Sequence, residues 1–169
     1  MYKVILIISL VLFTSCSWIG FGQDEKPFVY VDKKDAILIN DGDFANVCTV
    51  CASSLSDDFK TNHTARYEDS NYQYCSLHCF AKHLKLSKKI KNPKVIDVNS
   101  LKFIDVSKAY YVIDSDIESS KSDISKFAFS SLVDAREFQE ENDGDVVNFY
   151  KALDVAREDF IEKSWYDIF

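Results

Sequence analysis

The stretch that decides the fold is Thr64-Ala-Arg-Tyr-Glu-Asp-Ser-Asn-Tyr-Gln-Tyr-Cys-Ser-Leu-His-Cys-Phe80, in the middle of the 169-residue chain. Residues 64–69 alternate in polarity as a β-strand does, Ser70-Asn71 is typical of a turn, and residues 72–75 form a second short strand, which predicts a hairpin. Ser76 is a good N-cap, and apolar residues recur after it at helical spacing, which predicts a helix directly after the hairpin. These apolar residues are Leu77, Phe80, Ala81 and Leu84.

The second half of the chain repeats this order of elements. In the first half, Pro93 stops the helix and residues 94–98 form a further strand, which completes a ββαβ unit. Superposing Cys75-Ser76-Leu77 on Ser130-Ser131-Leu132, 55 residues further on, aligns the two junctions between hairpin and helix, which indicates an internal duplication. The second unit is expected to consist of strands at 109–113 and 126–129, a helix at 132–139 capped by Ser131, a break at 142–144 and a strand at 146–149.

The predicted fold class is therefore α+β, with two tandem ββαβ units that share their apolar faces. The first, cysteine-rich unit is expected over residues 47–107 and the second over residues 108–150. A C-terminal helix within residues 151–169 is expected to dock on both. With 47% apolar residues, 4 glycines and 2 prolines, the chain has the composition of a compact core and not that of a disordered or collagen-like protein.

The net charge of the chain argues against nucleic acid as a partner. There are 20 lysines and arginines against 27 aspartates and glutamates, which gives a net charge of −7. Phosphate binding needs a clustered cationic face, and such a balance does not favour one.

The first residues have the pattern of a secretion signal. The apolar run 4–13 is too short to cross a bilayer, and small residues stand directly before Cys16. Residues 1–15 thus resemble a bacterial signal peptide with a lipobox, in which Cys16 would carry the lipid; a plain signal peptide cut near this point is the alternative. Residues 16–46 are expected to be a lipid-anchored tether with one extended patch at 28–31. The expected location is a bacterial membrane, most simply the outer membrane, with the protein facing the periplasm.

Two closely spaced cysteine pairs carry the candidate chemistry. Cys48-Thr-Val-Cys51 and Cys75-Ser-Leu-His-Cys79 are separated by 23 residues, and a hairpin would bring the pairs together, as a tetrahedral thiolate site needs. On a helical wheel Cys79 lies opposite the apolar face, and as the third helical residue it has free amides and the helix dipole beside it, which favour a thiolate. The equivalent residue of the second unit is Asp134, so only the first unit is built for metal.

Three interpretations of the four cysteines remain open: a metal site, two disulfides in an oxidising compartment, or inert burial. Zn²⁺ suits a closed site of four thiolates, whereas Cu⁺ prefers soft sulfur and can use two or three of them. His83, four residues after Cys79, could replace one thiolate as a ligand. His63 and His78 are expected at the surface.

At these residues the chain resembles the NosL family, copper-binding lipoproteins that are accessory to nitrous-oxide reductase. The first cysteine region is also similar to the metal-binding modules called TRASH domains. The segments that carry the resemblance are Val47-Cys-Thr-Val-Cys-Ala52, Ala65-Arg-Tyr-Glu-Asp69, Tyr74-Cys-Ser-Leu-His-Cys-Phe80, Ala109-Tyr-Tyr-Val-Ile-Asp-Ser-Asp116, Phe127-Ala-Phe-Ser-Ser131, Ala135 and Phe138. The resemblance implies a doubled NosL/MerB-like fold, copper(I) bound at Cys48 and Cys51 with Cys75 and Cys79, and delivery to a periplasmic copper acceptor or exchange with a membrane copper exporter.

The chain departs from the family at the methionines that are thought to help bind copper. The family usually has Gly-Met where this chain has Ala52-Ser53, and commonly Ser-Pro-Met-Gly where this chain has Ser119-Ser-Lys-Ser122. Lys121 has no sulfur to donate, so the resemblance predicts a divergent member that binds metal through thiolates alone.

Two functional hypotheses follow. The first is a membrane-anchored copper(I) chaperone for a copper enzyme such as nitrous-oxide reductase, and the alternative is a structural or interaction lipoprotein whose cysteines hold zinc or form disulfides. A dithiol oxidoreductase is disfavoured, because polar residues 53–58 follow Cys48-Thr-Val-Cys51 where the helix of a thioredoxin-type motif would begin. No Ser-His-Asp set, carboxylate pair or Gly-rich phosphate loop stands out, so no enzymatic activity is expected.

Overall fold

The structure, a computed structural model, describes residues 26–40, 42–86, 89–119 and 121–166, with side chains except those of 43 and 159–166. The expected signal peptide, Cys16 and the start of the expected tether lie outside the described residues. No helix within the described ranges is long and apolar enough to span a membrane.

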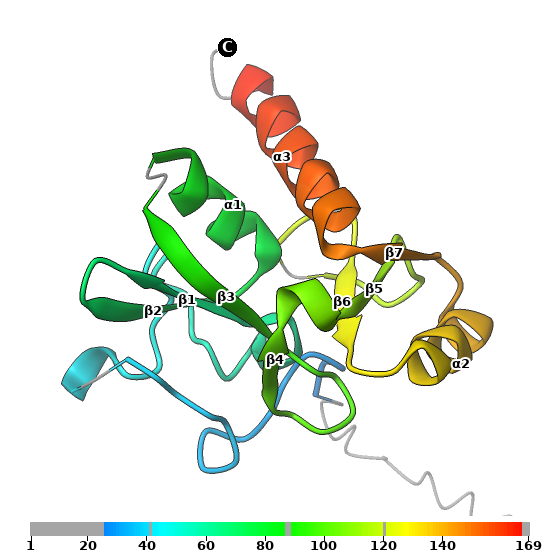
Figure 1. Ribbon diagram of the computed structural model, residues 1–169, viewed down its shortest axis with the longest axis horizontal. Coiled ribbons are helices and arrows are strands. Elements are labelled where there is room, and N and C mark those ends of the chain that lie inside the picture. Colours follow the sequence, from blue (N-terminus) through cyan, green and yellow to red (C-terminus); the bar gives the residue numbers. More distant parts are fainter. Residues whose placement is uncertain (1–25, 41, 87–88, 120, 167–169) are drawn as a thin grey trace, which may run out of the picture.

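Two antiparallel sheets, each with its own helix, form the body (Figure 1). The first sheet has the strand order β2-β1-β3-β4, and the second has the order β6-β5-β7. The first unit comprises β1 (His63–Tyr67), β2 (Ser70–Tyr74), α1 (Leu77–Leu86), β3 (Ile90–Ile96) and β4 (Phe103–Asp105). The second comprises β5 (Tyr110–Ile113), β6 (Lys126–Phe129), α2 (Leu132–Asn142) and β7 (Asp145–Asn148), and α3 (Phe149–Tyr166) follows it. Short 3₁₀ turns lie at Gly42–Phe44, Phe59–Thr61 and Val106–Lys108.

The doubled ββαβ prediction is confirmed. In each unit the first strand lies between the second strand and the strand that follows the helix, and all pairs are antiparallel. The strand β4 was not expected; it extends only the first sheet, by pairing with the end of β3.

The hairpin of the first unit turns two residues earlier than its composition suggests. Tyr67 pairs with Ser70, so the turn consists of Glu68 and Asp69, and Glu68 has a positive φ of 53°. Ser70-Asn71, predicted as the turn, is instead the start of β2. The physical reason is that a tight two-residue turn keeps both strands in full register, whereas polarity alone marks the wider polar stretch.

Pro93 lies inside β3, although the sequence suggested a strand only from residue 94. The strand tolerates it because the register with β1 shifts there, so that Asn92 and Pro93 face Ala65 in a β-bulge. Asn92 has a positive φ of 50°, as bulged residues often do.

The helices α1 and α2 begin at the predicted serine caps. The Cys79 amide donates to Ser76 Oγ at 3.3 Å, and the Val133 and Asp134 amides donate to Ser131 Oγ at 3.1 and 3.5 Å. These bonds satisfy amides that the first turn of a helix leaves without partners. The helix α2 runs to Asn142 and ends at Asp143, whose φ is positive.

The two units share one core, as the sequence suggested. A single cluster of buried side chains joins Tyr74, Leu77 and Phe80 of the first unit to Tyr111 of the second and Ala152 of α3. Figure 1 shows α3 beside α1, and the contacts between these helices place α3 on the core of both units.

The segment before the first cysteine belongs to the folded body from residue 28 onward, which shortens the expected tether. Val29 and Val31 are buried, each in a different apolar cluster, and the Val31 amide donates to the Ser56 carbonyl at 3.0 Å. Residues 28–31 form no strand. Burial of the two valines favours packing on the body over an extended tether in water.

Candidate metal centre

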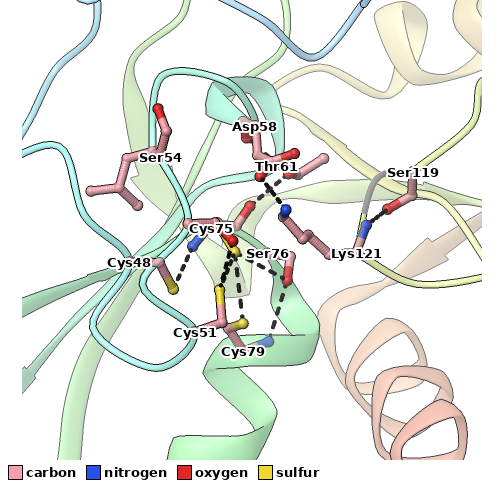
Figure 2. A network of polar contacts seen from close by, with 12 residues as sticks. Cys48, Cys51, Ser54, Asp58, Thr61, Cys75, Ser76, Cys79, Ser119 and Lys121 are labelled. Atoms are coloured by element: carbon pink, nitrogen blue, oxygen red, sulfur yellow. Dashed lines mark hydrogen bonds and ion pairs between the residues drawn. The ribbon is translucent and has the colours of Figure 1, made fainter. Parts of the chain in front are cut away.

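Four sulfur atoms converge between the loop 46–56 and the start of α1 (Figure 2). The Sγ atoms of Cys48, Cys51, Cys75 and Cys79 all lie within 4.8 Å of one another. The Cys75 sulfur is 3.5 Å from that of Cys51 and 3.6 Å from that of Cys79. None of the four is in a disulfide, because such a bond would need about 2.05 Å between the sulfurs.

The loop 46–56 forms a tight knuckle that aims the first pair of cysteines. The Cys48 amide donates to the Ser53 carbonyl at 2.8 Å, and the Ala52 amide donates to the Cys48 carbonyl at 3.0 Å, with Ala52 at a positive φ of 60°. Thr49 fixes the knuckle to β2, because both its amide and its hydroxyl donate to the Gln73 carbonyl. Cys51 is thereby held over the end of β2.

The junction between β2 and α1 supplies the second pair. Cys75 follows the last residue of β2, its amide donates to the Cys48 sulfur at 3.4 Å, and its carbonyl accepts from the Thr61 hydroxyl at 2.7 Å. Cys79 lies one turn into the helix, where the Ser76 cap fixes its backbone. The Ser76 cap therefore fixes Cys79 relative to Cys75, and the hairpin fixes this second pair of cysteines relative to the first.

Three of the four sulfurs are shielded from water. Cys48, Cys75 and Cys79 are buried, while Cys51 is exposed. The helical wheel placed Cys79 on the side of α1 away from the core, and this is wrong: Cys79 is 4% exposed and belongs to the same buried cluster as Leu77 and Phe80. The site is thus a buried cluster of sulfur atoms with one exposed edge, at Cys51.

Charge in the metal-free cluster collects on Cys48. Hydrogen bonds from the Cys75 and Cys79 thiols, and then those from backbone amides, hold the pKa of the Cys48 thiol far below its usual range. The hydrogen bond with Cys48 and burial raise the pKa of both the Cys75 and the Cys79 thiol, which opposes the low pKa expected for Cys79 from its helix position. Sulfurs this close repel one another when all are charged, so full deprotonation requires a bound cation.

The spacing of the sulfurs fits a single ion. In a tetrahedral site with metal–sulfur bonds of about 2.3 Å, the sulfurs are about 3.8 Å apart. The observed separations of 3.5 and 3.6 Å, and the 4.8 Å limit for the whole set, need only small movements to reach this value. A soft cation matches a ligand set made only of thiolates.

None of the three histidines belongs to the group of four sulfurs. His83, predicted as a possible ligand, instead accepts or donates a hydrogen bond at 2.8 Å to the Tyr74 hydroxyl, among the rings of Tyr67 and Tyr72. His63 was expected at the surface, and this is wrong: it is the first residue of β1, is fully buried, and its ring lies against those of Phe80 in α1 and Tyr111 in the second unit. His78 is half-buried. His83 does lie one helical turn after Cys79, but its ring packs among the aromatic side chains of the hairpin.

Two charged residues beside the sulfurs were not singled out as part of the site. Lys121 Nζ lies 3.3 Å from Asp58 Oδ2, and Asp58 is joined to the Cys75 end of β2 through Thr61, whose hydroxyl reaches both the Asp58 and the Cys75 carbonyl (Figure 2). In the sequence, Lys121 stands out only as the position where the family commonly has a methionine. A charge pair between residues this far apart in the chain has no local sequence signal.

A doubled α+β domain that gathers four thiols at one helix N-terminus defines the class: a small protein built to bind a soft metal ion. The sequence model of the NosL family matches residues 39–155, and the chain belongs to this family. The match includes all four cysteines of the cluster.

A solved structure has the same fold. It is the crystal structure of the copper chaperone NosL from Shewanella denitrificans, with a TM-score of 0.54 and 19% sequence identity over 69% of this chain and 93% of that one. No curated protein sequence matches the chain.

Proposed function

We propose that this protein is a copper(I) chaperone that binds one Cu⁺ through the thiolates of Cys48, Cys51, Cys75 and Cys79. The observation that carries the proposal is the convergence of the four sulfurs within 4.8 Å. Membership of the NosL family and the shared fold with a copper chaperone support copper as the ion. The protein binds and transfers the ion without catalysing a reaction.

Transfer is expected at the exposed edge of the site. A sulfur or imidazole ligand of the acceptor forms a bond to Cu⁺ as the bond to Cys51 breaks, and the three buried sulfurs are then replaced in turn. The thiols that are released take up protons as the ion leaves. The negative net charge of −7 favours docking of a cationic acceptor surface.

We also propose the anchor and the partners that the sequence suggests. The N-terminal pattern supports a lipid on Cys16 and a position on the periplasmic face of a bacterial membrane, most simply the outer one. A membrane copper exporter would supply the ion, and a copper enzyme such as nitrous-oxide reductase would receive it. Mass spectrometry of the protein from membranes tests the anchor: a diacylglycerol adduct on Cys16 is expected, and an unmodified chain cut elsewhere contradicts it.

A structural zinc site is the second candidate, favoured by the burial of three of the four cysteines. Closed sites of four thiolates are typical of structural zinc. A zinc protein would hold its ion against a copper(I) donor and would unfold when the ion is removed.

Competition with a chromophoric Cu⁺ chelator tests the proposal. The reduced protein should take one Cu⁺ per chain from the chelator. Loss of a group that only supports a ligand weakens metal binding roughly 10- to 100-fold, and Cys48→Ser should weaken Cu⁺ binding by more than this. Ser130→Ala, at the equivalent position to Cys75 in the second unit, is the control and should leave the affinity unchanged. No uptake of Cu⁺ by the reduced wild-type protein, or purification from periplasm with two disulfides by intact mass, would contradict the proposal.

A further inference from the structure

The sulfur cluster has a fixed cation beside it. Lys121, from the connection between β5 and β6 of the second unit, reaches across to the first unit and pairs with Asp58 at 3.3 Å. The Asp58 side chain is 3% exposed and that of Lys121 is 28% exposed, so the pair lies mostly out of water. Figure 2 shows the Lys121 side chain directed toward the group formed by Asp58, Thr61 and Cys75.

The anchoring of this lysine is specific. Its ammonium meets a buried carboxylate, and its amide donates to the Ser119 hydroxyl at 3.4 Å. Asp58 in turn lies at the 3₁₀ turn whose Thr61 hydroxyl bonds to the Cys75 carbonyl. The positive charge is therefore held at a fixed place relative to the sulfurs.

The ammonium and the thiolates interact. Burial alone would lower the pKa of Lys121, but the Asp58 carboxylate and then the charges of Cys75 and Cys51 outweigh burial and raise it. Lysine thus stays charged. Its field, opposed in part by that of the paired Asp58 carboxylate, acts on the cluster through surroundings that screen charge less than water does.

We propose that Lys121 is a specificity-determining residue that biases the cluster toward a monovalent ion over a divalent one. The inference rests on the proposed function, because it concerns the choice of ion by the same four thiolates. It adds that the choice depends on a charge supplied by the second unit, which holds none of the four sulfurs.

The physical basis is the difference in charge between the two loaded sites. Four thiolates carry a net charge of −3 with a monovalent ion and −2 with a divalent ion. A fixed cation stabilises the more negative site more strongly, and this difference does not depend on how many protons the empty site holds. At an effective dielectric constant of about 20, a unit charge roughly 10 Å away changes the ratio of the two affinities by about tenfold.

The test measures Cu⁺ and Zn²⁺ affinities of the reduced protein separately, each by competition with a chelator, and compares their ratio between variants. Lys121→Gln and Lys121→Leu both remove the charge, so that failure of one to fold leaves the other. Lys121→Arg keeps the charge and should rescue. Lys108→Gln is the matched control, because Lys108 also pairs with an aspartate but is 80% exposed and is a residue of a different turn.

The expected result is a fall of about tenfold in the Cu⁺/Zn²⁺ affinity ratio in both neutral variants, with the wild-type ratio in Lys121→Arg and Lys108→Gln. A merely structural role would weaken both ions equally and leave the ratio unchanged, and that result overturns the inference. Failure of the wild-type protein to bind Cu⁺ would instead remove the proposed function, so the two failures are distinguishable.

Discussion

The two units of this protein build the same junction and use it for different chemistry. The first junction (residues 75–79) and the second junction (residues 130–134) each lead from a strand into a helix capped by serine. In the first, the amide of Cys75 donates to a sulfur of Cys48 at 3.4 Å, whereas in the second the amide of Ser130 donates to a carboxylate oxygen of Asp97 at 2.9 Å. The two equivalent amides thus each donate a hydrogen bond to an acceptor that another segment of the chain supplies.

What differs is the side chains that the covering loop provides. The loop 46–56 brings two thiols to the first junction. The chain after β3 brings Asp97 and Asn99 to the second, where Asn99 donates to the Asp134 carboxylate at 3.0 Å. The lesson is that the duplicated ββαβ unit supplies a capped helix terminus, and the loop laid over it decides whether four sulfurs gather at that terminus or it only holds the fold.

The largest expected effect comes from converting the first junction into the second. Cys79→Asp replaces a soft sulfur with a hard oxygen at one corner of the site. Affinity for Cu⁺ should fall by about a thousandfold, or about 4 kcal/mol, in chelator competition. Aspartate suits the first helical turn, but Cys79 is 4% exposed, so circular dichroism of the variant is the check that it folds. An affinity within tenfold of the wild type would mean that Cys79 is not a ligand.

The contact between the units should make stability depend on pH. His63 of β1 bonds to the Thr61 carbonyl and the Tyr111 hydroxyl, and burial lowers its pKa to about 4. Because the unfolded chain binds this proton near pH 6.5 and the folded chain does not, stability is full above pH 6.5 and falls by about 3 kcal/mol toward pH 4.

Urea unfolding of metal-free protein between pH 4 and 7 measures this slope, with His63→Gln as the comparison. The variant is expected to be less stable at pH 7 but to lose less stability on acidification than the wild type. Equal slopes in the two proteins would contradict the assignment of the acid sensitivity to His63.

The two serine caps should be equally important in the empty protein and unequal in the loaded one. Ser76→Ala and Ser131→Ala should each cost about 1 kcal/mol of unfolding free energy without metal. With the ion bound, Cys79 is held by the metal as well, so the cost of Ser76→Ala should shrink while that of Ser131→Ala stays. Equal costs in the loaded protein would show that the ion does not bridge the first junction.

The smallest expected effect tests whether the loop 46–56 is needed for tight metal binding. Placing cysteines at Ser130 and Asp134 gives the second junction the same pair as the first, but no thiols lie over it. Copper titration of this double variant should still end at one tightly bound ion per chain. A second tight site would mean that the loop 46–56 is dispensable.

Local sequence patterns were sufficient for the scaffold and for the convergence of the four sulfurs. A hairpin, a serine cap and helical spacing act over a few residues, so the junction at Ser76 and its repeat at Ser131 could be predicted. The cysteine spacing predicted the convergence of the sulfurs because the hairpin fixes where the second pair lies relative to the first.

The remainder depends on contacts between distant segments. The burial of His63 depends on Tyr111 of the other unit, and the place of Lys121 depends on Asp58, neither of which is a sequence neighbour. Pro93 is accommodated by a bulge that involves β1. Val29 and Val31 form no strand and bury their side chains in clusters made by residues far along the chain.

X-ray absorption at the copper edge of the reduced protein, loaded with one Cu⁺ per chain, tests the central claim most directly. The account predicts a first shell of sulfur alone, and the number of sulfur neighbours should drop when Cys48 is replaced by serine. A first shell that contains nitrogen or oxygen, or one that is the same in Cys48→Ser, would show that the ion is held elsewhere than among the four thiols.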